Sequence, residues 1–418
     1  MAIPIELVRD AKTEFDLTEE ADQQSLYALT EALLALPDIS ETEVIKEARK
    51  KGVPLEFRIA AKLFGSRRYL QANDQPVKVA VIFAMWGEQN RLHPKSRNNP
   101  NGEDSLRVKL DQLAWATQGT AIDWHLYAVD DGCPHDSGKI AEQIASEHTL
   151  ADKVSVLFLQ DAIPAGEGPL TRLQSVGDSR KGGAVILGAM QAMEDGMDAI
   201  IYTDADNSVH LGQIGLLLRP HLDNGRRVVL GNRKHADAVL VKQESRWGIG
   251  IKLLRHMQRM VGQPIFSRGI LDTQAAFKLY QREVVLRSIA EPTVFDFSFD
   301  TDWILAAIAC NEPMKTVPFA FIDSFAESAS ITQGPMTTWE TLLLGLVKAV
   351  RKHDVPHSEA MALVLEEEIQ SSADLDILIH HLPPQLESAT EKDFGDPQVM
   401  SPEEVRAWIR QRKMEESA

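Results

Sequence analysis

Acidic side chains directly follow two short apolar runs of the sequence. The run AIDWHLYAV leads into Asp130 and Asp131, and the run DAIIYT leads into Asp204 and Asp206. Carboxylates at the end of a buried strand can accept hydrogen bonds from a ligand's N–H and hydroxyl groups, or bind a hard cation such as Mg²⁺ or Mn²⁺. The first pair predicts recognition of a polar ligand. The second predicts a metal site whose remaining ligands are water and phosphate oxygens.

A basic, glycine-rich segment lies between the two acidic pairs. Lys181 precedes Gly182 and Gly183, and a helical stretch follows at residues 184–194. Glycines let a ligand approach the backbone closely, and a helix start offers free N–H groups to a phosphate. Taken singly, each of the three motifs also fits an ordinary acidic turn or helix start. Their order along the chain favours a nucleotide site.

These motifs need a scaffold, and the middle of the chain predicts one. Strand-like runs alternate there with helical stretches: runs at residues 77–85, 121–129, 154–159, 198–203 and 227–231, helices at 105–116, 139–147 and 184–194. This alternation is typical of an α/β fold with a mostly parallel central sheet flanked by helices. Ligands of such sheets bind beyond the carboxyl ends of the strands, which is where the acidic pairs lie.

The two ends of the chain have a different pattern. We expect three units: an N-terminal helical extension at residues 1–75, the α/β domain at 76–335, and an acidic helical extension at 336–418. In the last unit, Ser401 before Pro402, Glu403 and Glu404 has the features of a helix N-terminus. Helical periodicity shows which face of a helix is buried but indicates no catalytic function. We therefore expect these extensions to pack on the domain or contact a partner.

Composition excludes several classes of function. The chain has 418 residues, with 44 basic and 61 acidic side chains and a net charge of −17, which argues against a nucleic-acid-binding protein. Two cysteines, Cys133 and Cys310, allow neither a disulfide framework nor a cysteine zinc site. The sequence has no secretory signal pattern and no long apolar run. We expect a cytoplasmic protein with at most peripheral membrane contact, and a homo-oligomer stays possible.

One segment opposes the acidic total. Residues 233–268 contain eight basic and two acidic side chains, a net charge of +6, and part of this segment has amphipathic helical spacing. Such a helix could lie at a membrane surface or hold an anionic acceptor. Equally, it could pack in the core with its cations facing solvent.

The motifs together resemble a known family. VDDGCPHDSG, RKGGAVILGAMQA and TDADNS are similar to the nucleotide-binding half of the family 2 glycosyltransferases, which have the GT-A fold. Farther along, VVLGNR, GILDTQAAFKLY and FSFDTDWILAA resemble the branch that makes dolichyl-phosphate glucose and dolichyl-phosphate mannose. The resemblance covers about residues 77–330. It implies a metal-dependent enzyme that uses a nucleotide diphosphate sugar and Mg²⁺ or Mn²⁺.

The resemblance also implies roles for individual residues. Asp302 matches the carboxylate that acts as catalytic base or orients the acceptor, and Asp300 is its nearby competitor. Asp204 and Asp206 match the metal ligands. The residues implied in binding the nucleotide sugar are Glu88, Asp130, Asp131, Lys181, Asp204, Arg233, Asp272 and Gln274.

The implied reaction is an inverting hexosyl transfer to a phosphate-bearing acceptor such as polyprenyl phosphate. UDP-glucose is the favoured donor, and GDP-mannose is possible. Residues 323–330 (DSFAESAS) lack the basic residue that lipid-phosphate-using relatives have beside the equivalent serine. A soluble acceptor such as a phosphorylated glycerate therefore stays open, as does a non-catalytic regulatory protein that binds nucleotide sugars.

Overall fold

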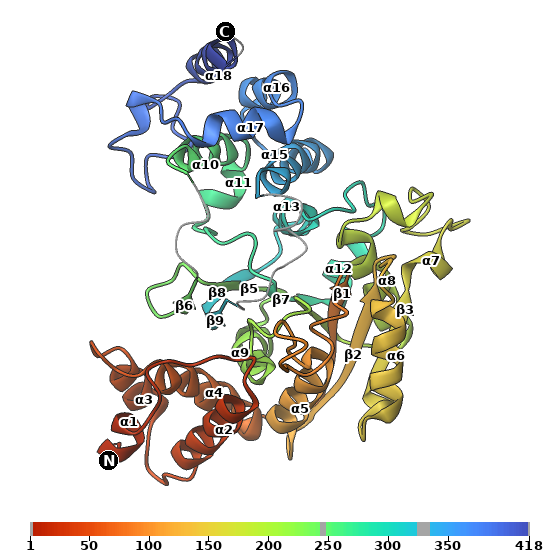
Figure 1. Cartoon of the computed structure of the whole chain (residues 1–418), viewed down its shortest axis with the longest axis vertical. Coiled ribbons are helices and arrows are strands. Elements are labelled where there is room, and N and C mark those ends of the chain that lie inside the picture. The colour runs from red at the N-terminus through yellow and green to blue at the C-terminus, as the bar shows by residue number, and fades with distance from the viewer. Residues whose placement is uncertain (1–2, 243–247, 324–334, 417–418) are drawn as a thin grey trace.

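The centre of the computed structural model is a seven-stranded sheet (Figure 1). The structure describes residues 3–242, 248–323 and 335–416. The strand order is β3-β2-β1-β4-β7-β5-β8, and β7 runs antiparallel to both of its neighbours. The predicted α/β fold with a mostly parallel sheet is confirmed. The strands are β1 (Val77–Met85), β2 (Ile122–Asp130), β3 (Val154–Phe158), β4 (Ala199–Thr203), β5 (Val228–Asn232), β7 (Phe277–Gln281) and β8 (Met314–Pro318).

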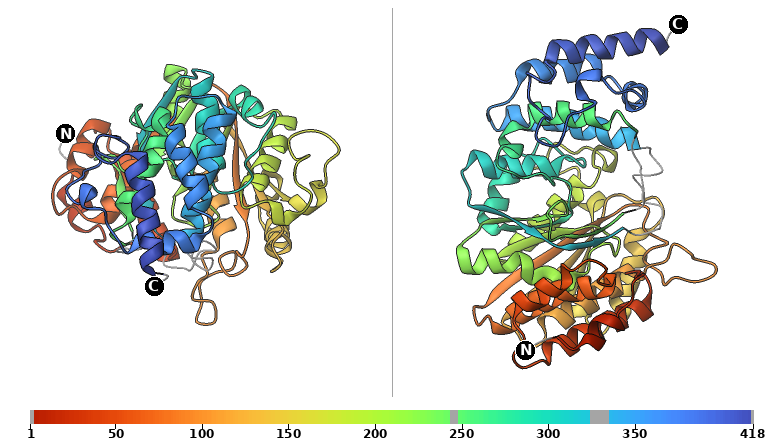
Figure 2. Two further views of the ribbon diagram at one scale, coloured as in Figure 1. Left: turned by 90° about the horizontal axis from the view of Figure 1, so that it is seen from above. Right: turned by 90° about the vertical axis from the view of Figure 1, so that its left-hand side faces the viewer.

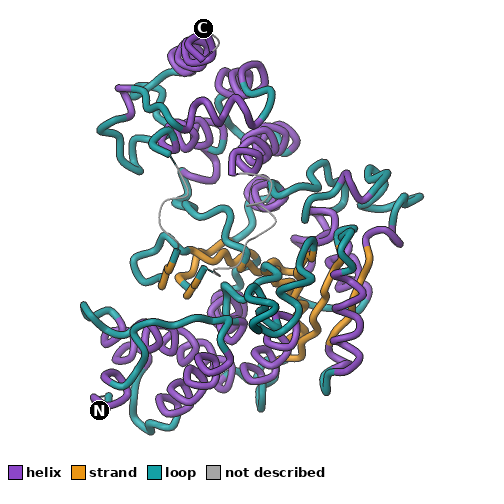
Figure 3. Tube along the Cα trace, viewed as in Figure 1, coloured by secondary structure: helices purple, strands orange, loops and turns teal. Residues whose placement is uncertain are grey.

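Helices cover both faces of this sheet (Figure 3), because apolar side chains of its strands alternate between two cores. In β1, Val79, Val81 and Phe83 face one core, and Ala80 and Ile82 face the other. The first core contains α5 (Ser105–Thr117), α6 (Ser137–Glu147) and α9 (Ile214–Asn224). The second contains α8 (Gly182–Glu194), α10 (Ile251–Val261) and α13 (Phe299–Ala309), with the short α7 (Leu159–Ala162), α11 (Gln263–Phe266) and α12 (Arg282–Ser288) nearby in the chain.

The N-terminal helices form a third core on one end of the molecule (Figure 2). They are α1 (Ile5–Arg9), α2 (Glu20–Leu34), α3 (Glu41–Ala48) and α4 (Leu55–Ala72). Gly52 has a φ of +83° and Pro54 precedes α4, so the chain turns between α3 and α4. The core also takes side chains from a small parallel pair, β6 (Val239–Val241) and β9 (Ala320–Ile322), which ties these helices to the domain.

The C-terminal helices lie at the opposite end of the long axis (Figure 2). They are α15 (Pro335–Lys352), α16 (Glu359–Glu368), α17 (Ser372–Ile379) and α18 (Pro402–Glu416). The helix start expected at Ser401 is present: Glu404 accepts a hydrogen bond from the Ser401 N–H at 2.7 Å, and Ser401 Oγ accepts one from the Glu404 N–H at 3.3 Å. Apolar side chains of these helices join the second core of the sheet.

Three cations of the basic segment bind this C-terminal extension. Arg255 and Arg259 of α10 form ion pairs with Glu391, and the Lys252 ammonium donates to backbone carbonyls of Leu386 and Glu387. They therefore hold part of the acidic tail. Arg246, also counted in this segment, and residues 324–330 of the DSFAESAS stretch lie outside the described residues. Within the described ranges, no helix has the length and apolar character needed to cross a bilayer.

Candidate active site

The two carboxylates after β4 lie among cations at the carboxyl edge of the sheet. The Lys181 ammonium forms an ion pair with Asp204, whose side chain is 38% exposed. Burial would raise the pKa of Asp204. The positive charge of Lys181, with smaller contributions from Arg233 and Lys109, instead lowers this pKa below its ordinary value. Asp206 is half-buried, and its Oδ1 accepts a hydrogen bond from the Ser208 N–H at 3.0 Å. The edge thus holds charged groups of both signs that a charged ligand could engage.

Lys181 reaches Asp204 from a strained backbone position. It directly precedes the first residue of α8. Its backbone has φ +76° and ψ −47°, a conformation that residues other than glycine rarely adopt. Its N–H donates to Asp131 Oδ2 at 2.6 Å, and the Ser179 hydroxyl donates to Asp131 Oδ1 at 2.6 Å. Asp131 therefore fixes the turn that presents Lys181. Burial raises the pKa of Asp131 to about 6.

Asp130 holds the next turn of the chain. Its carboxylate accepts hydrogen bonds from the N–H groups of Gly132, Cys133 and Gly138, at 2.9, 2.8 and 2.7 Å. Gly132 has a φ of +75°, and a Cβ there would lie 2.4 Å from the Cβ of Val176. These contacts support a structural role for Asp130 as an organiser of the loop between β2 and α6. Its contact with a nucleoside stays a prediction.

Arg233 and Asp272 form a second pair at the same edge. The guanidinium binds the carboxylate in a bidentate way, at 2.9 Å from Nε and 2.7 Å from Nη2, and the Arg233 N–H adds a bond of 2.8 Å. Burial opposes both charges, yet the pairing raises the pKa of Arg233 and lowers the pKa of Asp272. Nearby in sequence, the side-chain nitrogen of Gln274 is buried and has no hydrogen-bond partner among the described residues. Its contact with the donor sugar stays a prediction.

A buried lysine–aspartate pair lies below these groups. Lys278 of β7 is fully buried, and its ammonium donates to Asp300 at 2.9 Å, to the Tyr202 hydroxyl at 2.8 Å and to the Ala275 carbonyl at 2.6 Å. Burial lowers the pKa of Lys278 and raises the pKa of Asp300. The ammonium groups of Lys278 and Lys181 lie 5.1 Å and 6.0 Å from the centre of the Tyr202 ring, so Asp300 belongs to the same cluster as Asp204.

Asp302 is directed elsewhere. Residues two apart on a helix point about 200° apart, and in α13 this turns Asp302 towards α15 while Asp300 faces β7. The Asp302 carboxylate is 1% exposed and is bound by His353 Nε2 at 2.8 Å and by the Lys352 ammonium at 3.1 Å. The structure thus brings Asp300, and not Asp302, to the cluster around Asp204.

A further buried network supports the loops on this edge. Arg91 bridges Glu88, at 2.8 Å, and Glu103, at 3.1 Å, and Glu103 accepts the N–H of Asn207 at 2.7 Å. Burial raises the pKa of Glu88. Glu88 is thus a partner of Arg91, and its predicted contact with the ligand stays a prediction.

Sequence reasoning missed most of this network. Arg91 and Glu103 lie in a polar stretch without a motif. Lys109 is fully buried in α5, and its ammonium donates to the backbone carbonyl of Asp206. Lys109 could have been found from the sequence, because it falls on the apolar face of an amphipathic helix. A lysine there predicts a buried ammonium, which needs a hydrogen-bond partner.

The donor set at Asp204 and Asp206 fits a divalent cation bound together with phosphate. Two carboxylates on one loop give Mg²⁺ or Mn²⁺ hard oxygen ligands and leave positions for water and phosphate. Within residues 3–242, 248–323 and 335–416, no group of three or more His, Cys, Asp or Glu side chains is arranged as a site for a metal alone. A metal here would depend on the ligand for part of its coordination.

Comparison with known proteins agrees with this chemistry. The glycosyl transferase family 2 model matches residues 100–287, a range that includes Asp130, Asp131, Lys181, Asp204 and Asp206. The human dolichyl-phosphate beta-glucosyltransferase is 25% identical over 265 residues, which cover 59% of this chain and 72% of that protein. The mouse protein of the same name is 23% identical over 251 residues, 58% of this chain and 67% of that protein.

The chain is also similar to solved structures. A glucosyl-3-phosphoglycerate synthase from Mycobacterium tuberculosis in complex with phosphoglyceric acid covers 77% of this chain, with 87% of its own chain matched, at a TM-score of 0.45 and 14% identity. The sequence matches are the firmer result, since the matched family range includes the predicted nucleotide and metal motifs. Residues 100–287 of the chain therefore match the glycosyl transferase family 2 domain, and the chain is a glycosyltransferase.

Proposed function

We propose that the chain is a metal-dependent, inverting hexosyltransferase that moves glucose from UDP-glucose to the phosphate of a polyprenyl phosphate. The observation that carries this proposal is the convergence of three cations on carboxylates at one sheet edge: Lys181 with Asp204, Arg233 with Asp272 and Lys278 with Asp300. The names of the curated relatives, dolichyl-phosphate beta-glucosyltransferases, support the choice of sugar and acceptor.

The cations suit a leaving nucleoside diphosphate. Its negative charge grows as the bond to the sugar breaks, and positive groups fixed beforehand stabilise that charge. Lys181 is 20% exposed and Arg233 is 14% exposed, so both can exchange a carboxylate partner for a phosphate oxygen. A divalent ion held by Asp204 and Asp206 would supply further positive charge to the diphosphate.

Asp300 is the carboxylate that we assign to the acceptor. Its pKa is raised by burial, which favours proton uptake. A phosphate acceptor is already anionic near neutral pH, so it needs cations for positioning more than it needs a base. Lys278 binds Asp300 directly, and the positive charge of Lys181 acts on the same carboxylate. In this arrangement Asp300 orients the acceptor and takes a proton from a protonated one.

The acceptor can be tested directly. The purified chain is given UDP-glucose and Mn²⁺ with either a short-chain polyprenyl phosphate or 3-phosphoglycerate, and UDP release and glucosylated product are measured. We expect the lipid phosphate to accept glucose with a β-configured product by NMR. Transfer to 3-phosphoglycerate alone would replace the lipid acceptor by a soluble one. Tight UDP-glucose binding without transfer to either acceptor would favour the regulatory alternative.

The pKa of Asp131 predicts how donor binding depends on pH. Because burial raises this pKa from 3.8 to about 6, the carboxylate is ionised above pH 6 and protonated below it. Protonation weakens its acceptance of the Lys181 N–H, which fixes the turn that presents Lys181. Donor affinity should therefore fall by up to about tenfold per pH unit as the pH drops from 6 to 5. Calorimetry with UDP-glucose on the native chain and on Asp131→Asn checks this. A native profile that matches the variant's would contradict the assignment.

A further inference from the structure

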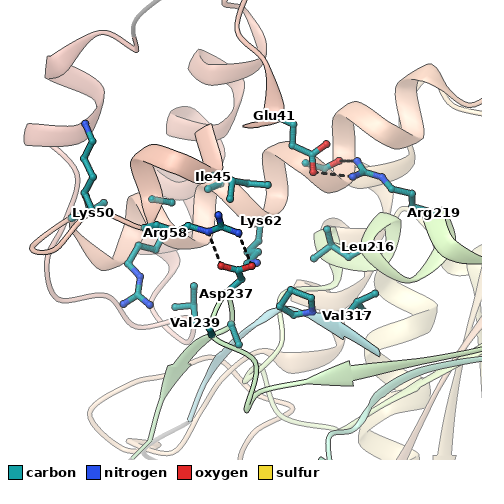
Figure 4. A pocket seen from close by; sticks show the side chains of 18 of the residues that line it. Glu41, Ile45, Lys50, Arg58, Lys62, Leu216, Arg219, Asp237, Val239 and Val317 are labelled. Carbon is teal, nitrogen blue, oxygen red and sulfur yellow. Dashed lines mark hydrogen bonds and ion pairs between the residues drawn. The ribbon is translucent and has the colours of Figure 1, made fainter. Parts of the chain in front are cut away.

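A cavity of about 450 Å³ lies between the N-terminal helices and the α/β domain (Figure 4). Its walls come from α3, α4, the loop between them, α9, the segment leading into β6, and the end of β8. Apolar side chains form part of the wall, among them Ile45, Leu216, Val239 and Val317. This volume is typical of a site for a small molecule. None of the lining residues belongs to the cation–carboxylate cluster of the active site.

The charge of this cavity is strongly positive in a chain of −17. Six basic and two acidic side chains line it: Arg49, Lys50, Lys51, Arg58, Lys62 and Arg219, with Glu41 and Asp237. Each carboxylate is already paired (Figure 4). Arg49 binds Asp237 through two bonds of 2.7 Å, and Arg219 binds Glu41 at 2.9 Å.

Three of the cations are left without a carboxylate. Among the described residues, Lys51, Arg58 and Lys62 form no ion pair, and Lys50 pairs with Glu47 outside the cavity wall. Arg58 and Lys62 are both half-buried and lie four residues apart on α4, so they share one face of the helix.

Space and electrostatics around Lys62 agree with an anion. Ala61, the position before Lys62 on α4, carries only a methyl group, and at Gly65 the Glu41 carboxylate occupies the space that a side chain would take. Burial lowers the pKa of Lys62 to about 8, although Asp237 and Glu41 act in the opposite direction. Because its surroundings solvate this half-buried ammonium poorly, an anionic partner would stabilise its charged form.

We propose that this cavity is a second binding site, separate from the active site, for a small soluble phosphomonoester. Arg58 and Lys62 bind the phosphate, and Lys51 adds charge at the rim. The guanidinium of Arg58 offers a planar fork of donors that matches phosphate oxygens, and the Lys62 ammonium contributes a point charge. The apolar wall contacts the carbon skeleton of the ligand.

The wall of this cavity is connected to the active site through the chain. Asp237, which Arg49 holds in the wall, is four residues after Arg233, whose guanidinium binds Asp272. The residues between Arg233 and β6 therefore link the wall of this cavity to the donor site.

The site is tested by calorimetry with glycerol 3-phosphate on the full chain, in the presence of excess UDP and Mg²⁺ so that the nucleotide site is filled. We expect saturable binding to the native chain. Arg58→Gln with Lys62→Gln should weaken it about tenfold or more, since two charge-assisted contacts are lost. Lys46→Gln, an exposed lysine of α3 outside the cavity, is the matched control and should bind like the native chain.

Several outcomes would overturn the proposal. Equal affinity in the double variant and in the native chain would place the phosphate elsewhere. Absence of binding to a native chain that still binds UDP would remove the second site, whatever the fate of the proposed reaction. Binding to vesicles that contain phosphatidic acid, without binding of glycerol 3-phosphate, would replace the soluble ligand by a lipid headgroup. A circular-dichroism melt of each variant confirms that it is folded.

Discussion

Replacement of Asp300 by asparagine should lower the rate of sugar transfer by about 10²-fold, the cost of misplacing a reacting group by about 1 Å, because Asp300 orients the acceptor. The change removes the carboxylate that faces Lys278 and the cluster around Asp204, and leaves the donor-binding pairs in place. Donor affinity should therefore stay within a few-fold of the native value. Initial rates from UDP release, together with calorimetry for UDP-glucose, separate the two effects.

Asp300→Asn also leaves the fully buried Lys278 without its carboxylate, which could unfold the protein by itself. The double variant Asp300→Asn with Lys278→Met removes both charges and so avoids an unpaired buried cation. If the double variant melts near the native temperature and still lacks transfer, loss of folding is not the cause. Near-native transfer by a folded Asp300→Asn variant would contradict the assignment.

Asp302→Asn is the natural comparison, because the two residues lie two positions apart on the same helix. Asp302 binds His353 and Lys352 at the end of α15, so its loss should weaken the attachment of the C-terminal helices. We expect a stability loss on the order of 3 kcal/mol for breaking such a buried contact, with transfer kept in the folded fraction. The reverse pattern, in which Asp302→Asn abolishes transfer and Asp300→Asn does not, would restore the base predicted from the sequence.

Asp206→Ala should remove the dependence of UDP-glucose binding on Mn²⁺. With one of two proposed carboxylate ligands gone, the metal loses part of its protein coordination, and we expect donor affinity in Mn²⁺ to fall by about 10-fold to 100-fold. The native chain treated with a chelator should show the same weak affinity. Calorimetry with and without Mn²⁺ measures both.

A matched control for this change is Asp223→Asn. Asp223 is exposed at the end of α9, accepts a hydrogen bond from the Tyr69 hydroxyl at 2.7 Å and lies outside the cluster. Its variant should keep the full metal effect. If Asp206→Ala and the native chain bind UDP-glucose equally, with Mn²⁺ and without it, the metal site is not at Asp204 and Asp206.

Much of the scaffold follows from local patterns. The strand expected at residues 77–85 is β1, and the other four expected runs match β2, β3, β4 and β5 to within one residue at each end. Buried parallel strands are short, continuous and β-branched, so their sequence signal is strong. The positions of the two acidic pairs, directly after β2 and β4, follow from the same signal.

The contacts within the site could not be predicted in this way. Nothing in the sequence FKLYQ shows that β7 runs antiparallel between β4 and β5, yet this topology brings Lys278 beside Tyr202 and Asp300. Likewise, the choice between Asp300 and Asp302 depends on which helix covers α13. That helix, α15, belongs to an extension that the family motifs do not include.

The strained turn at Lys181 has a consequence for how this protein could be engineered. A positive φ costs a lysine on the order of 1 kcal/mol or more, and glycine would occupy the same turn without that penalty. A search for more thermostable variants should therefore favour glycine at this position, and would at the same time delete the ammonium that holds Asp204. At position 181, selection for thermal stability should favour glycine, whereas selection for catalytic turnover should favour lysine.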